Sequence, residues 1–116
     1  MKTRSCKNKG QRLQKFVVTE LREQLNFDVG VTTCFEGVIQ ANPMGNSGRD
    51  VKLSGDAQDK IRYDIECKNC EAWNIPNFWK QTITNTDEGR KPLLVIKKNR
   101  HEPLVVMRFS DWKELI

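Results

Sequence analysis

The stretch R62-Y-D-I-E-C-K68 alternates polar and apolar residues, which predicts a β-strand with one buried face. Its last part, I65-E-C-K-N-C70, allows two interpretations. Cys67 and Cys70 form a Cys-x-x-Cys pair, as in a redox centre or half of a zinc site. Glu66 and Lys68 have instead the acidic and basic groups that metal-dependent phosphodiester chemistry needs. The surrounding sequence has to decide between them.

A second alternating run, R49-D-V-K-L53, precedes this strand, and the turn-like S54-G-D-A-Q-D59 lies between the two. Together they predict a β-hairpin. If the hairpin is centred on residue 58, Asp50 lies opposite Glu66 and Val51 lies opposite Ile65. One face is then apolar and includes Cys67, while the other is charged. The charged face carries Asp50, Lys52, Asp64, Glu66 and Lys68.

Two carboxylates that face each other across a hairpin have Cβ atoms only ~5 Å apart, which is unfavourable without a positive charge between them. Mg²⁺ is typically bound by one or two carboxylates at ~2.1 Å, together with water and phosphate oxygens. Lys68 lies on the same face, ~6.6 Å further along the strand. Asp50, Glu66 and Lys68 are therefore candidates for metal-assisted phosphodiester hydrolysis. An isolated E-x-K tripeptide more often marks a solvated strand face.

The cysteine interpretation has less support. A structural zinc site needs four ligands, and the other candidates, Cys6, Cys34 and His101, are not spaced as a second ligand pair. A redox Cys-x-x-Cys pair normally lies at the N-terminus of a helix, where the helix dipole lowers the thiol pKa. Cys67 instead lies inside a predicted strand.

The chain has 116 residues and a net charge of +5, and it is expected to be a single domain over residues 1–116. Residues 1–10 form a basic arm, and seven of the basic residues lie within residues 1–22, against one acidic residue. Such a segment attracts a phosphate backbone, although a solubilising tail has the same composition. The candidate nucleic-acid contacts are Lys7, Lys9, Arg12 and Arg49.

No apolar run reaches the roughly 20 residues that are needed to span a membrane. The segment M1-K-T-R-S-C-K-N-K-G10 also lacks the apolar core of a secretory signal. We therefore expect a cytoplasmic protein whose cysteines are thiols.

Periodicity predicts two main helices. The first covers residues 11–26, and the second runs from Asn74, its N-cap, to about Asp87, with Pro76 in its first turn and Gly89 after its end. The expected buried stripes are Leu13, Phe16, Val17, Leu21 and Leu25 on the first helix, and Ile75, Trp79 and Ile83 on the second.

The other segments are expected to be short. Residues 29–40 should include one strand, 42–48 a loop, 92–97 and 104–109 two more strands, and the residues from Ser110 a helix capped by that serine.

The residues G48-R-D50, I65-E-C-K68 and Gln81 resemble the PD-(D/E)XK nuclease superfamily. The resemblance extends from K9-G-Q-R-L13 to about Phe109 and is strongest to small phage-encoded endonucleases and archaeal-type Holliday junction resolvases. It implies an α/β fold with a restriction-endonuclease-like core, in which helices flank a central mixed β-sheet.

The resemblance also implies roles for individual residues. Asp50, Glu66 and the backbone carbonyl of Cys67 would bind Mg²⁺, for which Mn²⁺ can substitute. Lys68 would activate the attacking water, and Gln81 matches a polar residue near that water, although an exposed helix glutamine is an equal alternative. The sequence departs from the family where Gln11 and Gln14 stand in place of a helix glutamate, and where Gly48-Arg49 replaces the usual proline segment.

We therefore expect a Mg²⁺-dependent DNA endonuclease, acting in the host cytoplasm if it is phage-encoded. A non-catalytic nucleic-acid-binding protein with the same fold is the alternative. Cleavage of a branched junction needs two active sites a fixed distance apart, so that substrate predicts a symmetric homodimer. A monomer would favour nicking or degradation of linear DNA.

Overall fold

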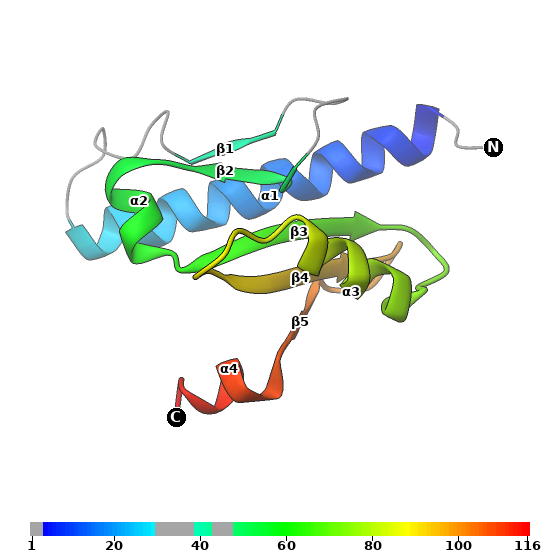
Figure 1. Cartoon of the computed structure of the whole chain (residues 1–116). Coiled ribbons are helices and arrows are strands. Elements are labelled where there is room, and N and C mark those ends of the chain that lie inside the picture. Colours follow the sequence, from blue (N-terminus) through cyan, green and yellow to red (C-terminus); the bar gives the residue numbers. More distant parts are fainter. Residues whose placement is uncertain (1–3, 30–38, 43–47) are drawn as a thin grey trace.

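The computed structural model describes residues 4–29, 39–42 and 48–116 (Figure 1). A mixed three-stranded sheet in the order β3-β4-β5 is flanked by helices, and a two-stranded sheet, β1-β2, lies beside it. The fold is therefore α/β with a central mixed sheet between helices, as predicted. The elements along the chain are α1 (Arg4–Val29), β1 (Ile39–Ala41), β2 (Val51–Leu53), α2 (Gly55–Lys60), β3 (Tyr63–Asn69), α3 (Ile75–Thr84), β4 (Lys91–Lys97), β5 (Leu104–Met107) and α4 (Phe109–Lys113).

Helix α1 packs on one face of the sheet and supplies much of the core. It begins within the predicted basic arm, before the expected start at residue 11. Leu13, Val17 and Leu25 are buried as predicted, but Phe16 is 47 % exposed and Val18 is buried in its place. Each step of four residues advances the stripe by about 40° around the helix axis, because a turn contains 3.6 residues. This drift turns the buried stripe toward Val18 and away from Phe16.

The predicted hairpin between residues 49–53 and 62–68 is wrong. β2 pairs antiparallel with β1, with Gln40 opposite Lys52, whereas β3 pairs parallel with β4, with Glu66 opposite Leu94. The segment expected to be a turn is instead the helix α2. Ala57 within this helix and Ile61 just after it are both buried in the hydrophobic core. The apolar contacts of this connection therefore favour a helix over a tight turn. The strand predicted within residues 29–40 overlaps β1 only at residues 39 and 40, and Val29 is the last residue of α1. Residues 30–38, and residues 43–47 of the predicted loop, lie outside the described residues.

Both faces of β3 are covered, as is typical of a parallel strand. Ile65 and Cys67 join the core beneath α1, and Asp64 and Glu66 are buried on the opposite face. The predicted alternation of side chains along this strand is confirmed. The alternative interpretation, in which Glu66 lies on a solvated strand face, is wrong, because α3 and the segment after it cover that face (Figure 1).

Helix α3 begins as predicted, since the side chain of Asn74 accepts a hydrogen bond from the backbone N–H of Asn77. It ends at Thr84, earlier than expected. The predicted apolar stripe is wrong at Ile75 and Ile83, which are both exposed, while Thr82 is fully buried. Thr82 tolerates burial because its hydroxyl donates a 2.7 Å hydrogen bond to the carbonyl of Phe78.

The C-terminal part follows the prediction more closely. The two strands expected here are β4 and β5, which pair antiparallel, with Val95 opposite Val105. α4 is present but begins at Phe109 with Arg108 as its N-cap residue, so Ser110 is not the cap. Within the described ranges, no helix has both the length and the apolar character of a membrane-spanning segment.

Candidate active site

Asp50, Glu66 and Lys68 meet at the outer edge of β3. The backbone N–H of Asp50 donates to the carbonyl of Ile65 at 3.1 Å, and the N–H of Cys67 donates to Oδ2 of Asp50 at 2.7 Å. These two bonds join Asp50 to Ile65 and Cys67, the residues before and after Glu66. The two carboxyl groups lie within hydrogen-bonding reach of each other. The predicted meeting of Asp50 and Glu66 is therefore present, although a different strand pairing produces it.

The backbone of Cys67 faces the same edge. Within a strand, the N–H and C=O of one residue project to the same side. Because the N–H of Cys67 reaches Asp50, its carbonyl oxygen is also directed toward that edge. The thiol of Cys67 points instead into the core, where burial and the neighbouring carboxylates raise its pKa well above the usual range. Cys67 can therefore contribute a carbonyl oxygen here but not a reactive thiolate.

The thiol of Cys70 is only half-buried and donates a 3.4 Å contact to the carbonyl of Ala72. Among the described residues, no group of three or more His, Cys, Asp or Glu side chains is placed to hold a metal ion. A zinc site of four side chains is therefore absent from this part of the chain, and the paired carboxylates remain as the side chains that could share a cation.

The electrostatics of this pair are unfavourable without a cation. Glu66 is only 4 % exposed, and burial together with the charge of Asp50 raises its pKa to about 7. Burial also raises the pKa of Asp50, although the Cys67 N–H and Lys68 oppose this shift. The pair therefore tends to retain a proton near neutral pH. A divalent cation bound by the two carboxyl groups would favour the loss of that proton.

Lys68 lies beside the carboxylates. Its Nζ is 3.8 Å from Oε2 of Glu66 and 5.6 Å from the centre of the Phe78 ring, so α3 and Glu66 together orient the ammonium group. The side chain keeps 22 % of its area exposed, so Lys68 is only partly buried.

Sequence reasoning missed Asn85. This residue caps the C-terminus of α3, and its Nδ2 donates a 3.2 Å hydrogen bond to Oε1 of Glu66. The predicted Gln81 is exposed on the same helix, one turn before Asn85, and its backbone carbonyl accepts the N–H of Asn85. Residues four apart share a helix face, so Gln81 and Asn85 lie on the same side of α3. No local sequence motif marks Asn85, because its contact depends on where α3 ends.

A buried ion-pair network centred on Asp64 stabilises the chain next to the site. Asp64 accepts hydrogen bonds from Nε of Arg90 at 2.8 Å and from the N–H of Asp87 at 2.9 Å, and it lies 3.3 Å from Nε of Arg49. Arg90 also donates to the backbone carbonyls of Gln58, Ile61 and Tyr63. Arg49 directly precedes Asp50, so this network fixes the chain next to a candidate metal ligand.

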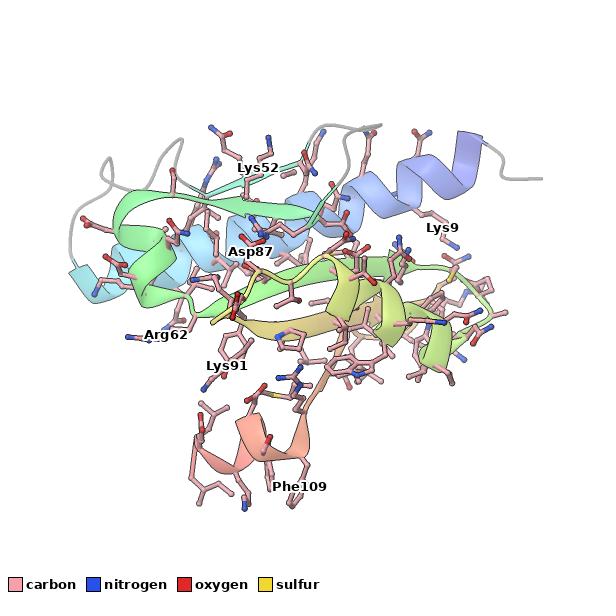
Figure 2. The ribbon with its side chains drawn as sticks, in the orientation of Figure 1. Lys9, Lys52, Arg62, Asp87, Lys91 and Phe109 are labelled. Atoms are coloured by element: carbon pink, nitrogen blue, oxygen red, sulfur yellow. The ribbon has the colours of Figure 1, made fainter. Side chains whose placement is uncertain are left out.

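The candidate nucleic-acid contacts have different surroundings. Lys9 pairs with Glu71 at 3.0 Å and reaches from α1 toward the loop after β3 (Figure 2). Arg12 is exposed, whereas Arg49 forms ion pairs with Asp64 and Asp87. The side chain of Lys7 lies outside those that the structure describes.

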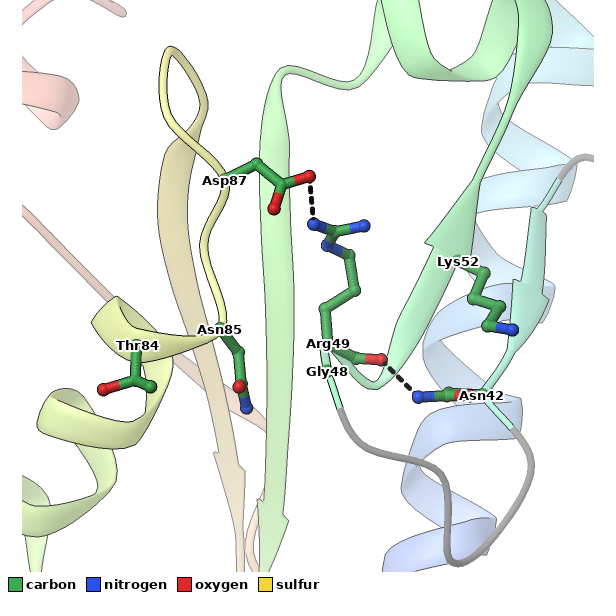
Figure 3. A pocket seen from close by; sticks show the side chains of 7 residues that line it. All are labelled: Asn42, Gly48, Arg49, Lys52, Thr84, Asn85 and Asp87. Atoms are coloured by element: carbon green, nitrogen blue, oxygen red, sulfur yellow. Dashed lines mark hydrogen bonds and ion pairs between the residues drawn. The ribbon is translucent and has the colours of Figure 1, made fainter.

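A polar cleft of about 360 Å³ opens between β2 and the end of α3 (Figure 3). Asn85 lines this cleft and also contacts Glu66, so the cleft adjoins the carboxylate pair. Lys52, predicted on the charged face, is exposed and lines the same cleft. The lining residues are Asn42, Gly48, Arg49, Lys52, Thr84, Asn85 and Asp87.

Comparisons with known proteins identify the family of this chain. No curated protein and no solved structure matches the chain. A family model described as "Phage putative PDDEXK endonuclease" matches residues 5–115. This match covers both carboxylates, the lysine and all of the sheet, and the chain therefore belongs to this family of phage PD-(D/E)XK endonucleases.

Proposed function

We propose that the protein is a metal-dependent DNA endonuclease that hydrolyses phosphodiester bonds, with Asp50, Glu66 and Lys68 as its catalytic residues. The observation that carries the proposal is the buried carboxylate of Glu66 beside the partly buried Asp50 and the partly exposed Lys68, at an edge where two hydrogen bonds join Asp50 to β3. A structural role alone gives little reason to bury two like charges together, since the arrangement destabilises the fold.

The donor set suits Mg²⁺, with Mn²⁺ as a substitute. Asp50, Glu66 and the carbonyl of Cys67 offer oxygen atoms, which hard divalent cations prefer, and these ions commonly complete their coordination with water and phosphate oxygens. A cation bound there supplies Lewis-acid polarisation of the phosphate. The carboxylates hold it and must both be ionised to do so.

The other proposed site residues orient the reacting groups and stabilise the charge that develops on the phosphate. Lys68 is placed to contact a non-bridging phosphate oxygen and to stabilise the negative charge that develops when water attacks phosphorus. Asn85 fixes the rotamer of Glu66 through its amide. Gln81 is proposed to contact the attacking water from the neighbouring turn of α3.

DNA is the proposed substrate, and the host cytoplasm is the proposed place of action. The excess of basic residues in the N-terminal part favours a phosphate backbone, and Lys7, Lys9, Arg12 and Arg49 are the proposed contacts. Within this class, a four-way junction is the narrower proposal, because a small nuclease that acts as a symmetric dimer can make paired cuts.

The test is to incubate the purified protein with a four-way junction, a linear duplex and a single strand, each with Mg²⁺, Mn²⁺ or EDTA. Cleavage is expected with either metal and not with EDTA. Asp50→Asn and Lys68→Ala are expected to lose at least about 100-fold in rate, since each removes charge from the reaction centre. The exposed Asp56→Asn and Lys60→Ala serve as matched controls and should cleave like the wild type.

The outcomes distinguish a junction resolvase, a broader nuclease and a protein that only binds DNA. Paired symmetric cuts confined to the junction would identify a resolvase, and cuts in every substrate would identify a broader nuclease. DNA binding without cleavage under any metal would contradict the catalytic proposal and support a nucleic-acid-binding protein that retains the fold.

Asn85→Ala is expected to slow cleavage by roughly 10- to 100-fold, because a hydrogen bond to a charged group contributes about 1.5–3 kcal/mol. The Mg²⁺ concentration for half-maximal rate should rise, while the dissociation constant for DNA stays unchanged. Thr84→Ala, in the same cleft but bonded within its own helix, is the matched control. An unchanged Mg²⁺ dependence in Asn85→Ala would show that Asn85 does not position Glu66.

A further inference from the structure

The C-terminal unit formed by β5 and α4 exposes several large apolar side chains. Helix α4 projects away from the sheet at the end of β5, and Phe109 points away from the body of the protein (Figures 1 and 2). The exposed fractions range from 45 % to 88 %. This C-terminal apolar patch comprises Leu104, Val105, Phe109, Trp112, Leu115 and Ile116.

Little in the described part of the chain covers this patch. The contacts of α4 with the body include an ion pair between Lys91 and Glu114, which holds its polar side. Its aromatic rings, Phe109 and Trp112, contact each other with centres 5.7 Å apart. The apolar side of α4 therefore faces solvent when the protein is alone.

The size of the patch is that of an interface. With roughly 150–250 Å² for an aromatic side chain and somewhat less for an aliphatic one, these exposed fractions correspond to on the order of 600 Å². The largest apolar patch of a typical monomer is about 300–600 Å². Two such patches buried against each other remove about 1,200 Å², which is the lower bound for a specific and stable protein interface.

The position of β5 favours a second copy of this chain as the partner. β5 is the outer strand of the sheet and runs antiparallel to β4, whereas the opposite edge, at β3, is occupied by Asp50. Two copies of one strand can pair antiparallel around a twofold axis that is perpendicular to the sheet. Such pairing joins the two three-stranded sheets into one of six strands and places α4 of each copy beside the start of β5 in the other copy.

Charge also favours self-association at this place. Residues 104–116 contain two basic and two acidic residues, Arg108, Lys113, Asp111 and Glu114, so their net charge is zero. The whole chain carries +5, and the excess lies near the N-terminus. Two copies repel each other least when they meet through this neutral surface.

We propose that β5 and α4 form the interface of a symmetric homodimer. With strands about 4.8 Å apart, the two copies of β3 lie roughly 24 Å from each other across the joined sheet. The twofold axis places both carboxylate pairs on the same face of that sheet. The interface is inferred independently of the nuclease activity, so either proposal can fail alone.

The experiment measures the mass of the full chain in solution by light scattering and sedimentation equilibrium over a range of concentrations. The wild type is expected to have twice the 13.5 kDa mass of one chain. The double variant Phe109→Glu/Leu115→Glu is expected to have the mass of one chain, because it buries two charges at the interface. Phe16→Glu, a comparable change on the exposed side of α1, should stay dimeric.

A wild type with the mass of one chain at every concentration would overturn the proposal, as would a double variant that stays dimeric. So would a Phe16→Glu variant that dissociates. Hydrogen exchange provides a measurement that needs no variant. The amides of residues 104–113 should exchange more slowly as the wild-type concentration rises, and exchange independent of concentration would contradict the interface.

Discussion

Glu66→Gln is expected to abolish DNA cleavage and, at the same time, to stabilise the metal-free protein at pH 8. The variant keeps the shape and the Asn85 contact site of the side chain but loses its negative charge. Activity should fall by roughly 10³-fold or more, because the cation then has one ionised carboxylate in place of two. DNA binding should remain or become tighter, since a negative charge near the phosphate is removed.

The stability change follows from the raised pKa. The pKa of Glu66 is about 7 in the folded protein, against 4.5 for an exposed glutamate, so the folded state binds the proton more tightly than the unfolded state. The free energy of unfolding therefore falls as the pH rises from about 4.5 through 7, by up to about 3 kcal/mol. Glutamine does not ionise and avoids this loss. The variant should match the wild type near pH 4 and exceed it at pH 8.

Urea unfolding at both pH values in EDTA measures this difference. Adding Mg²⁺ should stabilise the wild type at pH 8 and leave the variant nearly unchanged, because the ion binds to the folded site. Glu88→Gln, an exposed carboxylate after α3, should stay within about 0.5 kcal/mol of the wild type. If Glu66→Gln is less stable than the wild type at pH 8, the buried carboxylate contributes to the fold and the proposed conflict between stability and function is wrong.

The sequence predicted which residues of this site would meet, but not how they meet. The alternation in residues 62–68 identified β3 and the opposite directions of Cys67 and Glu66, because side-chain direction in a strand depends on the chain alone. Strand pairing depends instead on contacts between distant segments. The partner of β3 is β4, and Asp50 arrives through its hydrogen bonds to Ile65 and Cys67.

Asn85 and Arg90, which contact the buried carboxylates, were likewise not predicted from the sequence. Asn85 lay near the end of the predicted helix and Arg90 lay just beyond it, and helical periodicity does not predict which polar side chains at a helix end turn toward the sheet. Their functions arise because the segment after α3 folds beneath β3, where Asn85 meets Glu66 and Arg90 meets Asp64. The exposed Ile75 and Ile83 are the converse case, since their helical spacing predicted burial that the tertiary packing does not provide.

Asp64→Asn is expected to destabilise the protein by about 3–5 kcal/mol, the largest loss of stability among these variants. Asp64 is almost fully buried and interacts with Nε of both Arg90 and Arg49. Asparagine has a similar shape but no charge, so the substitution leaves two guanidinium groups without their buried counter-charge. Loss of this counter-charge should also free Arg49 and loosen the neighbouring Asp50, which lowers the cleavage rate of the protein that stays folded.

The control for this variant is Asp87→Asn, which removes a carboxylate that pairs with the same Arg49 but is 66 % exposed. Water screens that pair, so the expected loss is below about 1 kcal/mol. Urea unfolding at pH 7 compares the two variants directly. The buried position of Asp64, and not its contact with Arg49 as such, accounts for the difference between them. Equal losses in the two variants would contradict this explanation and would make the arginine contact itself the stabilising feature.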